Sequence, residues 1–263
     1  MMYLVEVKNM HILLKNKKII DGINLKFLRG KITSIIGPNG SGKTTILRAI
    51  CRNIKLSQGT IDLDGKDISS YSTKGFAKKV AFLSQNHECP EDIAVRELVR
   101  YGRYAHKSWW RGDTKEDDSV VGWALEMTGM IDFAERSMGT LSGGEKQRAW
   151  ISMALAQKPE LLILDEPTTY LDICYQLEIL ELIKHLNEKE GITVIMVLHD
   201  INQAARFSDE IAIIKKGKVF ASGSPFDVIN TDNLREVFGV ETDITYDSSG
   251  GNPVFYPKCI ACS

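Results

Sequence analysis

No apolar run in this chain approaches the roughly 18 consecutive residues that a membrane-spanning helix requires. Residues 1–5 lead directly into an alternation of apolar and polar residues, and not into the continuous apolar core of a signal peptide. We therefore expect a chain that stays in the cytosol and has no membrane span of its own.

The chain also has few cysteines and almost no net charge. The chain has 5 cysteines in 263 residues, and three of them are scattered, which fits a reducing compartment and not a disulfide framework. The formal net charge is −1, so the basic excess typical of nucleic-acid binding is lacking and we expect no nucleic-acid partner. With 43% hydrophobic residues, the chain can bury the core of one large α/β domain or two small lobes.

What is present most clearly is a glycine-rich loop at residues 37–45, GPNGSGKTT, which fits the pattern G-x-x-x-x-G-K-[ST]. Successive backbone N–H groups of such a loop surround phosphates, while Lys43 can reach the β- and γ-phosphates and Thr44 can ligate Mg²⁺. A strand pattern at 31–36 and a helix pattern at 45–50 flank it in the required order, which disfavours a plain glycine turn. The predicted nucleotide-binding residues are Gly37, Pro38, Asn39, Gly40, Ser41, Gly42, Lys43, Thr44 and Thr45.

The remaining patterns predict alternating strands and helices with a helical insertion. Antiparallel strands are expected before the loop, and residues 91–156 have helical periodicity without a convincing strand. The acidic stretch 116–118 is interpreted as a solvated helix start, and Trp109-Trp110 either pack this block or mark a partner surface. From Asp243 the chain is rich in Gly, Ser, Asp and Pro, which predicts irregular structure.

Four predicted strands end at polar residues. These ends are the phosphate loop, Gln85, Asp165-Glu166 and His199. Ligands of open parallel sheets bind outside the carboxyl ends of the strands, so we expect these segments to meet at one nucleotide. Asp165 would be the second Mg²⁺ partner and Glu166 would polarise the attacking water; the alternative is an ordinary acidic helix start followed by Pro167.

A second helix start, LSGGEKQR at residues 141–148, has the same anion-binding character as the phosphate loop. Its alternative is an ordinary N-cap with flexible glycines. The stretch resembles the signature motif of ATP-binding cassette (ABC) ATPases. The resemblance covers about Val5 to Gly223 and adds the Q-loop at Gln85, the Walker B motif at 161–166, the D-loop at 170–172 and the switch His199.

Membership of that family implies ATP and Mg²⁺ as cofactors and a second copy of the chain as partner. The signature of one subunit closes over the phosphate loop of the other, so Ser142, Gly143, Gly144 and Asp172 would contact the partner's nucleotide. Within one subunit the resemblance implies Glu166, His199 and Gln85 as catalytic residues, and Thr44, Gln85 and Asp165 as metal ligands.

Three segments are more narrowly similar to the ATPases of iron–siderophore, haem and cobalamin importers: residues 97–106, 166–173 and 198–204. Ala105 stands where those proteins usually have proline. The resemblance implies multi-span permease subunits as separate partners, a substrate-binding protein acting indirectly, and a peripheral location on the cytoplasmic face of the membrane. It also implies an aromatic residue near adenine, where this chain has Leu14 with His11 nearby.

Other functions remain as alternatives. The first is a soluble ABC ATPase of a cytosolic iron–sulfur assembly complex, which the importer-like segments disfavour. The second is a nucleic-acid repair ATPase, which the lack of a coiled-coil insertion disfavours. The third is a small-molecule kinase, which the signature motif disfavours. Cys259 and Cys262 could form half a zinc site, although no second pair exists, so reduced thiols are favoured.

The expected fold is therefore α/β: a RecA-like phosphate-loop NTPase core with an N-terminal antiparallel β subdomain and an inserted helical subdomain. We expect a single ABC ATPase domain over residues 1–263. The predicted parts are the nucleotide-binding core at 1–88 and 157–242, the helical subdomain with the signature motif at 89–156, and the irregular tail at 243–263.

Overall fold

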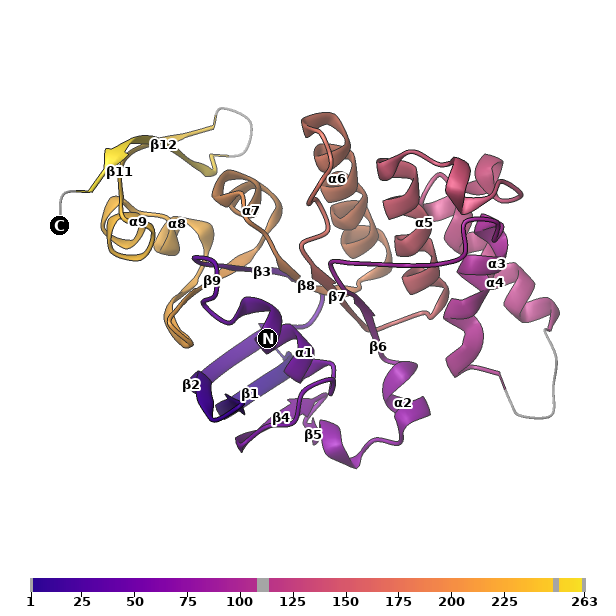
Figure 1. The fold of residues 1–263 in the computed structure, drawn as a ribbon, viewed down its shortest axis with the longest axis horizontal. Helices are drawn as coiled ribbons and strands as arrows, with labels where there is room; N and C mark the ends of the chain where they lie inside the picture. The colour runs from indigo at the N-terminus through magenta and orange to yellow at the C-terminus, as the bar shows by residue number, and fades with distance from the viewer. Residues whose placement is uncertain (1, 108–113, 248–250, 262–263) are drawn as a thin grey trace. The chain divides into compact units, whose positions relative to one another are not determined.

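The computed structural model describes residues 2–107, 114–247 and 251–261 (Figure 1). Two compact units divide the chain: residues 1–70 together with 193–263, and residues 71–192. In the described ranges no helix is both long and apolar enough to cross a membrane. The predicted Trp109-Trp110 feature lies outside the described residues.

The first unit contains an antiparallel sheet in the order β2-β1-β4-β5. Its strands are β1 (Tyr3–Leu14), β2 (Lys17–Leu28), β4 (Gln58–Leu63) and β5 (Lys66–Asp67). Val5 and Val7 are fully buried while their neighbours Glu6 and Lys8 are not, as the alternating pattern predicts. The predicted antiparallel β region is therefore confirmed.

The same unit holds parallel strands that carry the phosphate loop. β3 (Ile32–Ile36) pairs in parallel with β8 (Thr193–Val197) and β9 (Glu210–Lys215), and β10 (Lys218–Gly223) pairs antiparallel with β9. Every residue of β3 and β8 is buried, which is typical of parallel strands covered on both faces. Helices α1 (Lys43–Ile50) and α7 (Ile201–Phe207) follow β3 and β8 along the chain.

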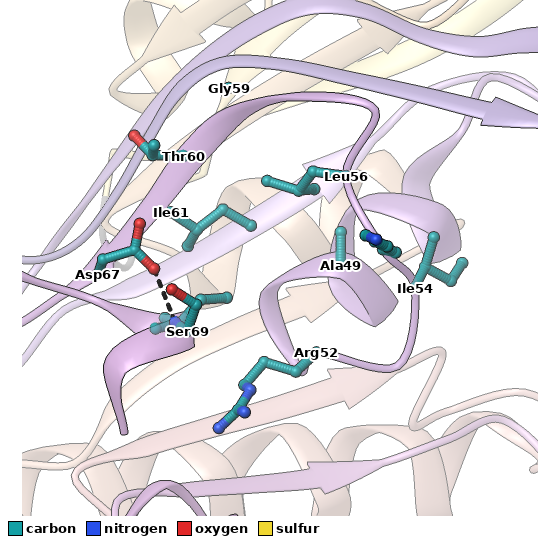
Figure 2. Close-up of a pocket in the computed structure, with 11 residues that line it drawn as sticks. Ala49, Arg52, Ile54, Leu56, Gly59, Thr60, Ile61, Asp67 and Ser69 are labelled. Carbon is teal, nitrogen blue, oxygen red and sulfur yellow. Dashed lines mark hydrogen bonds between the residues drawn. The ribbon is translucent and has the colours of Figure 1, made fainter. Parts of the chain in front are cut away.

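A pocket of about 370 Å³ lies at the C-terminal end of α1 (Figure 2). Figure 2 shows Asp67 and Ser69 at one side, where the Ser69 amide donates to Asp67 at 2.7 Å, and Ala49 and Ile54 at the other. The phosphate loop precedes the opposite end of α1, so this pocket is separate from the predicted nucleotide site.

The C-terminal region differs from the prediction. After α8 (Pro225–Val228) and α9 (Thr231–Phe238), strands β11 (Val240–Tyr246) and β12 (Pro253–Ile260) form an antiparallel hairpin, so the prediction of an irregular tail is wrong. Asn202 of α7 holds the hairpin with its side chain, donating to the Phe255 carbonyl at 3.2 Å and accepting from its amide at 3.0 Å. These partners are 53 residues apart, so local composition could not reveal them.

The second unit combines two parallel strands with helices. β6 (Val80–Leu83) pairs in parallel with β7 (Leu161–Asp165), and α2 (Thr73–Ala77) and α6 (Ile173–Glu190) belong to the same unit. Between the strands lie α3 (Val95–Tyr101), α4 (Lys115–Met127) and α5 (Gly143–Ala156), with short 3₁₀ turns at Gly102–Ala105, Ile131–Phe133 and Met138–Thr140. The predicted helical character of this block is thus present.

Within this block, one acidic residue is not solvated as predicted. Asp117 is 6% exposed and accepts a hydrogen bond from the equally buried Arg103 guanidinium at 2.8 Å. Burial alone would raise the pKa of Asp117, but the hydrogen bonds from Arg103 and Thr114 outweigh it and hold the pKa below its ordinary value. The acidic stretch does begin α4, with Thr114 and Asp117 forming a capping box.

We expect the substitution Asp117→Asn to destabilise the protein by about 3–5 kcal/mol, because it leaves the Arg103 charge buried without its partner. Asp118→Asn is the matched control: Asp118 also pairs with an arginine, but its side chain is 57% exposed, and the expected loss is below about 1 kcal/mol. Urea unfolding of both variants measures the difference. Equal losses would show that the buried pair has no special role.

Candidate nucleotide-binding site

The phosphate loop has a backbone shape that requires glycine at its first position. Gly37 has φ +148°, and a Cβ there would lie 2.1 Å from the Ile214 carbonyl oxygen. Gly40 and Gly42 also have positive φ, so the loop curves away from regular structure between β3 and α1. A curved loop of this kind directs its amides toward one point, as a phosphate-binding concavity needs.

Lys43 lies over this loop. Its ammonium group donates to the carbonyls of Gly37 at 2.9 Å and Pro38 at 3.1 Å, and the residue is 5% exposed. Ser41 Oγ is buried and has no hydrogen-bond partner among the described residues, so a donor for a ligand oxygen is available beside the lysine. Lys43 is also the first residue of α1, so the helix N-terminus adds its partial positive charge, as predicted.

His199 belongs to the same unit as the phosphate loop. It follows β8, which is the parallel neighbour of the strand that leads into the loop, with Ile35 opposite Val197. The exposed His199 therefore lies beyond the same edge of the sheet as the loop. Asp200 caps α7 by accepting from the Gln203 amide at 2.9 Å, which fixes the turn that carries the histidine.

In the second unit the structure brings Gln85 and Glu166 together. The Gln85 side-chain amide donates to Glu166 Oε2 at 2.6 Å, and Thr169 Oγ1 donates to the same oxygen at 3.2 Å. Glu166 has φ +56°, a conformation that a non-glycine residue rarely adopts without a constraint. Asp165, the last residue of β7, is 3% exposed. The carboxyl ends of β6 and β7 thus present an amide and two carboxylates.

The signature motif forms a strongly capped helix start. Ser142 is the N-cap of α5: its hydroxyl accepts from the Glu145 amide at 3.3 Å, and its own amide donates to the Glu145 carboxylate at 2.7 Å. These backbone and hydroxyl hydrogen bonds hold the pKa of Glu145 below its ordinary value because they favour the carboxylate. Ser142 and Gly143 are exposed, so this helix end is open to a ligand.

The D-loop and the first turn of α6 pack against the signature glycines. A Cβ on Gly143 would lie 3.4 Å from the Leu171 side chain. A Cβ on Gly144 would lie 2.5 Å from the Tyr175 ring, so only glycine allows this approach. Asp172 caps α6 by accepting from the Tyr175 amide at 3.1 Å. The signature residues Ser142–Gly144 and the segment that carries Asp172 therefore lie side by side within one unit.

Sequence reasoning missed Thr169 and Tyr175. Thr169 orients Glu166, and Tyr175 fixes the place of Gly144. Thr169 lies within the importer-like segment 166–173 and Tyr175 lies outside it. The sequence does not reveal the role of either residue, because each acts through a contact made only in the fold. Cys259 is exposed on β12 and Cys262 lies outside the described residues. Among the described residues, no group of three His, Cys, Asp or Glu side chains could hold a metal ion.

Two units that carry a phosphate loop, a capped signature helix and a Gln–Glu pair define a phosphate-loop ATPase. The sequence profile of the ABC transporter family matches residues 20–169. The chain therefore belongs to the ABC transporter family, and it is an ATP-hydrolysing subunit of that family.

Two relatives are similar over most of their length. The chain is 47% identical to the petrobactin import ATP-binding protein FpuC of Bacillus anthracis over 92% of this chain and 88% of that protein. It is also 47% identical to the iron(3+)-hydroxamate import ATP-binding protein FhuC of Bacillus subtilis, over 91% of this chain and 89% of that protein.

Two solved structures are similar in fold. A metal-chelate type ABC transporter in an inward-facing conformation matches with a TM-score of 0.86 and 24% identity, covering 98% of both chains. A dimeric ATP-binding cassette in a post-hydrolysis state with ADP and phosphate matches with a TM-score of 0.72 and 30% identity, covering 84% of this chain and 98% of that one. The expected α/β cassette fold is confirmed.

Proposed function

We propose that this chain hydrolyses ATP to drive the import of an iron–siderophore complex through a separate membrane permease. The observation that carries the proposal is the 47% identity to two siderophore import ATP-binding proteins, which extends over more than nine-tenths of the chain. The three importer-like segments at residues 97–106, 166–173 and 198–204 support it further. The chain would act as a peripheral subunit at the cytoplasmic face of the membrane.

Iron uptake tests this proposal. Deleting the gene in the source cell should abolish uptake of radioactive iron given as a hydroxamate or catecholate siderophore. The wild-type chain should restore it, and the Glu166→Gln variant should not. Unchanged uptake together with loss of cytosolic iron–sulfur enzyme activity would instead favour the assembly-complex function.

Within the site, each residue has a proposed role. Thr44 and Asp165, with Gln85, would hold Mg²⁺, and the burial of Asp165 at the end of a strand fits a carboxylate that pairs with a cation. Bound Mg²⁺ would neutralise the phosphate charge. Glu166 would accept a proton from the attacking water, and His199 would contact the terminal phosphate.

We propose that two copies close around two ATP molecules, with each signature motif over the partner's phosphate loop. Two anion-binding helix starts in one chain support this arrangement, since one nucleotide does not need both. Tyr170 and Ile173 flank Asp172 and are 90% and 76% exposed, which is unusual for large apolar side chains unless a partner covers them. The dimeric cassette described above is a related arrangement.

We propose that the permease docks on the helical subdomain at residues 89–156. A groove of about 540 Å³ lies beside α3 and is lined by Pro90, Asp92, Ile93, Glu97, Arg100, Tyr101 and Lys107. Tyr101 and the nearby Tyr104 are 59% and 78% exposed. Aromatic side chains beside mixed charges are typical of protein interfaces, so a short cytoplasmic segment of the permease is a suitable occupant.

The base of ATP should be bound weakly. Leu14 ends β1 with 41% exposure and offers no π-face for adenine, whereas His11 is held by Asn9 at 3.1 Å and Asp21 at 3.3 Å. Leu14→Tyr should tighten ATP binding several-fold, because base stacking contributes about 1–3 kcal/mol, and should leave kcat unchanged because the contact is remote from the reacting phosphate.

ATP titrations of the wild type and three variants measure this effect. Leu13→Tyr is the control, because the neighbouring side chain of a strand points to the opposite face and should gain nothing. A large loss of affinity in His11→Ala, with no gain in Leu14→Tyr, would place the base on His11 instead.

A further inference from the structure

The segment after Gln85 packs on the helix that presents the signature motif. The rings of His87 and Trp150 form a tilted stack, with centroids 4.8 Å apart and planes inclined by 31°. Trp150 belongs to α5, whose N-cap is Ser142, and both rings lie in the unit formed by residues 71–192. The stack therefore connects two motifs that the nucleotide chemistry uses separately.

The His87 ring points inward from an exposed segment. Its neighbours Asn86 and Glu88 are exposed, whereas His87 is half-buried. Burial lowers the pKa of its imidazole below the ordinary value. The ring packs against Trp150 as an aromatic group.

A second observation concerns the same two elements. Burial raises the pKa of the Cys89 thiol, and the Lys146 ammonium opposes that shift, so this charge lies near the thiol. Lys146 and Trp150 are four residues apart and share one face of α5. The His87 ring therefore packs on the face of α5 that Trp150 and Lys146 share.

On its other faces, α5 is anchored elsewhere. Ser152 Oγ shares a hydrogen bond of 2.6 Å with Oγ1 of Thr128, the C-cap of α4. Arg148 pairs with Glu178 of α6 at 2.6 Å. Only one residue separates His87 from Gln85, whose amide contacts Glu166 at 2.6 Å. The His87 ring is thus the short connection between this well-anchored helix and the Gln85–Glu166 pair.

We propose that His87 is a positioning residue for ATP hydrolysis. Its stack on Trp150 fastens the Gln85 loop to α5. Within one subunit, the Gln85 side-chain amide that contacts Glu166 therefore keeps a fixed position relative to Ser142 at the start of the helix. The inference rests on the proposed dimer, because the signature helix acts on the partner's nucleotide. Without the stack, the Gln85 loop and the Ser142 end of α5 would move independently of each other.

Steady-state kinetics with the full chain test this role. His87→Ala should lower kcat by about tenfold, as loss of an aromatic pair allows, with KM for ATP within about twofold of the wild type. His87→Phe keeps a flat aromatic ring and should restore kcat to within about twofold. Glu88→Ala, at the exposed neighbouring position, is the control and should have wild-type kinetics.

A double-mutant cycle and urea unfolding separate positioning from stability. Trp150→Ala should lower kcat as His87→Ala does, and the double variant should lower it no further, because both remove one contact. Urea unfolding curves should show that every variant is folded under the conditions of the kinetic assay.

Three results would overturn the inference: wild-type kcat in His87→Ala, a His87→Phe variant as slow as His87→Ala, or additive losses in the double variant. An inactive wild-type chain would contradict the proposed function itself and not this role of His87. Comparison with the wild type in the same assay therefore distinguishes the two failures.

Discussion

Glu166→Gln should bind ATP normally and hydrolyse it about 10²- to 10⁴-fold more slowly, the range expected for loss of a general base. The amide has nearly the shape of the carboxylate, and its oxygen can still accept from Gln85 and Thr169, which now contact Glu166 at 2.6 and 3.2 Å. What it cannot do is take a proton from water. The ATP-bound dimer should therefore accumulate on gel filtration.

Phosphate release measures the slower hydrolysis, and equilibrium nucleotide binding measures the unchanged affinity for ATP. Glu160→Gln is the matched control, since Glu160 precedes β7, pairs with Lys79 and lies at the other end of the strand from Asp165. Its turnover should equal that of the wild type. Ordinary steady-state hydrolysis by Glu166→Gln would remove Glu166 from the role of base.

The phosphate loop and the signature helix could be predicted because their chemistry is local in sequence. Gly37 and Lys43 are six residues apart, and their spacing alone specifies a curved loop followed by a helix. Ser142 and Glu145 form a capping box within four residues for the same reason. Strand ends are also visible in sequence, which is why Asp165 could be placed at the end of a strand and Gln85 and His199 just after strands.

Long-range partners could not be predicted. Asp117 has the composition of a solvated helix start, and only the fold brings the Arg103 guanidinium to it. The same holds for the C-terminal hairpin, which depends on Asn202. His87 and Trp150 are 63 positions apart by their numbers, so their stack has no local signature. In each case the residue types fitted a simpler interpretation until a distant partner supplied the missing contact.

Ser142→Arg should abolish hydrolysis while the isolated subunit keeps its affinity for ATP. Ser142 is exposed at the N-terminus of α5, where a cation opposes the helix dipole and fills the space that a partner's phosphates would occupy. The phosphate loop lies in the other unit of the same chain and is unchanged by the substitution. Ser142→Ala is the control: it removes the cap to Glu145, at a cost of about 1 kcal/mol, without adding charge or bulk.

The two substitutions together decide where the signature acts. If Glu166→Gln accumulates as an ATP-bound dimer, adding Ser142→Arg should return it to a monomer that still binds ATP, whereas adding Ser142→Ala should leave the dimer intact. This outcome follows because the signature contributes to the partner's site and not to its own. Loss of ATP binding by the Ser142→Arg monomer would show the opposite, namely that the α5 N-terminus contacts the nucleotide held by the same chain.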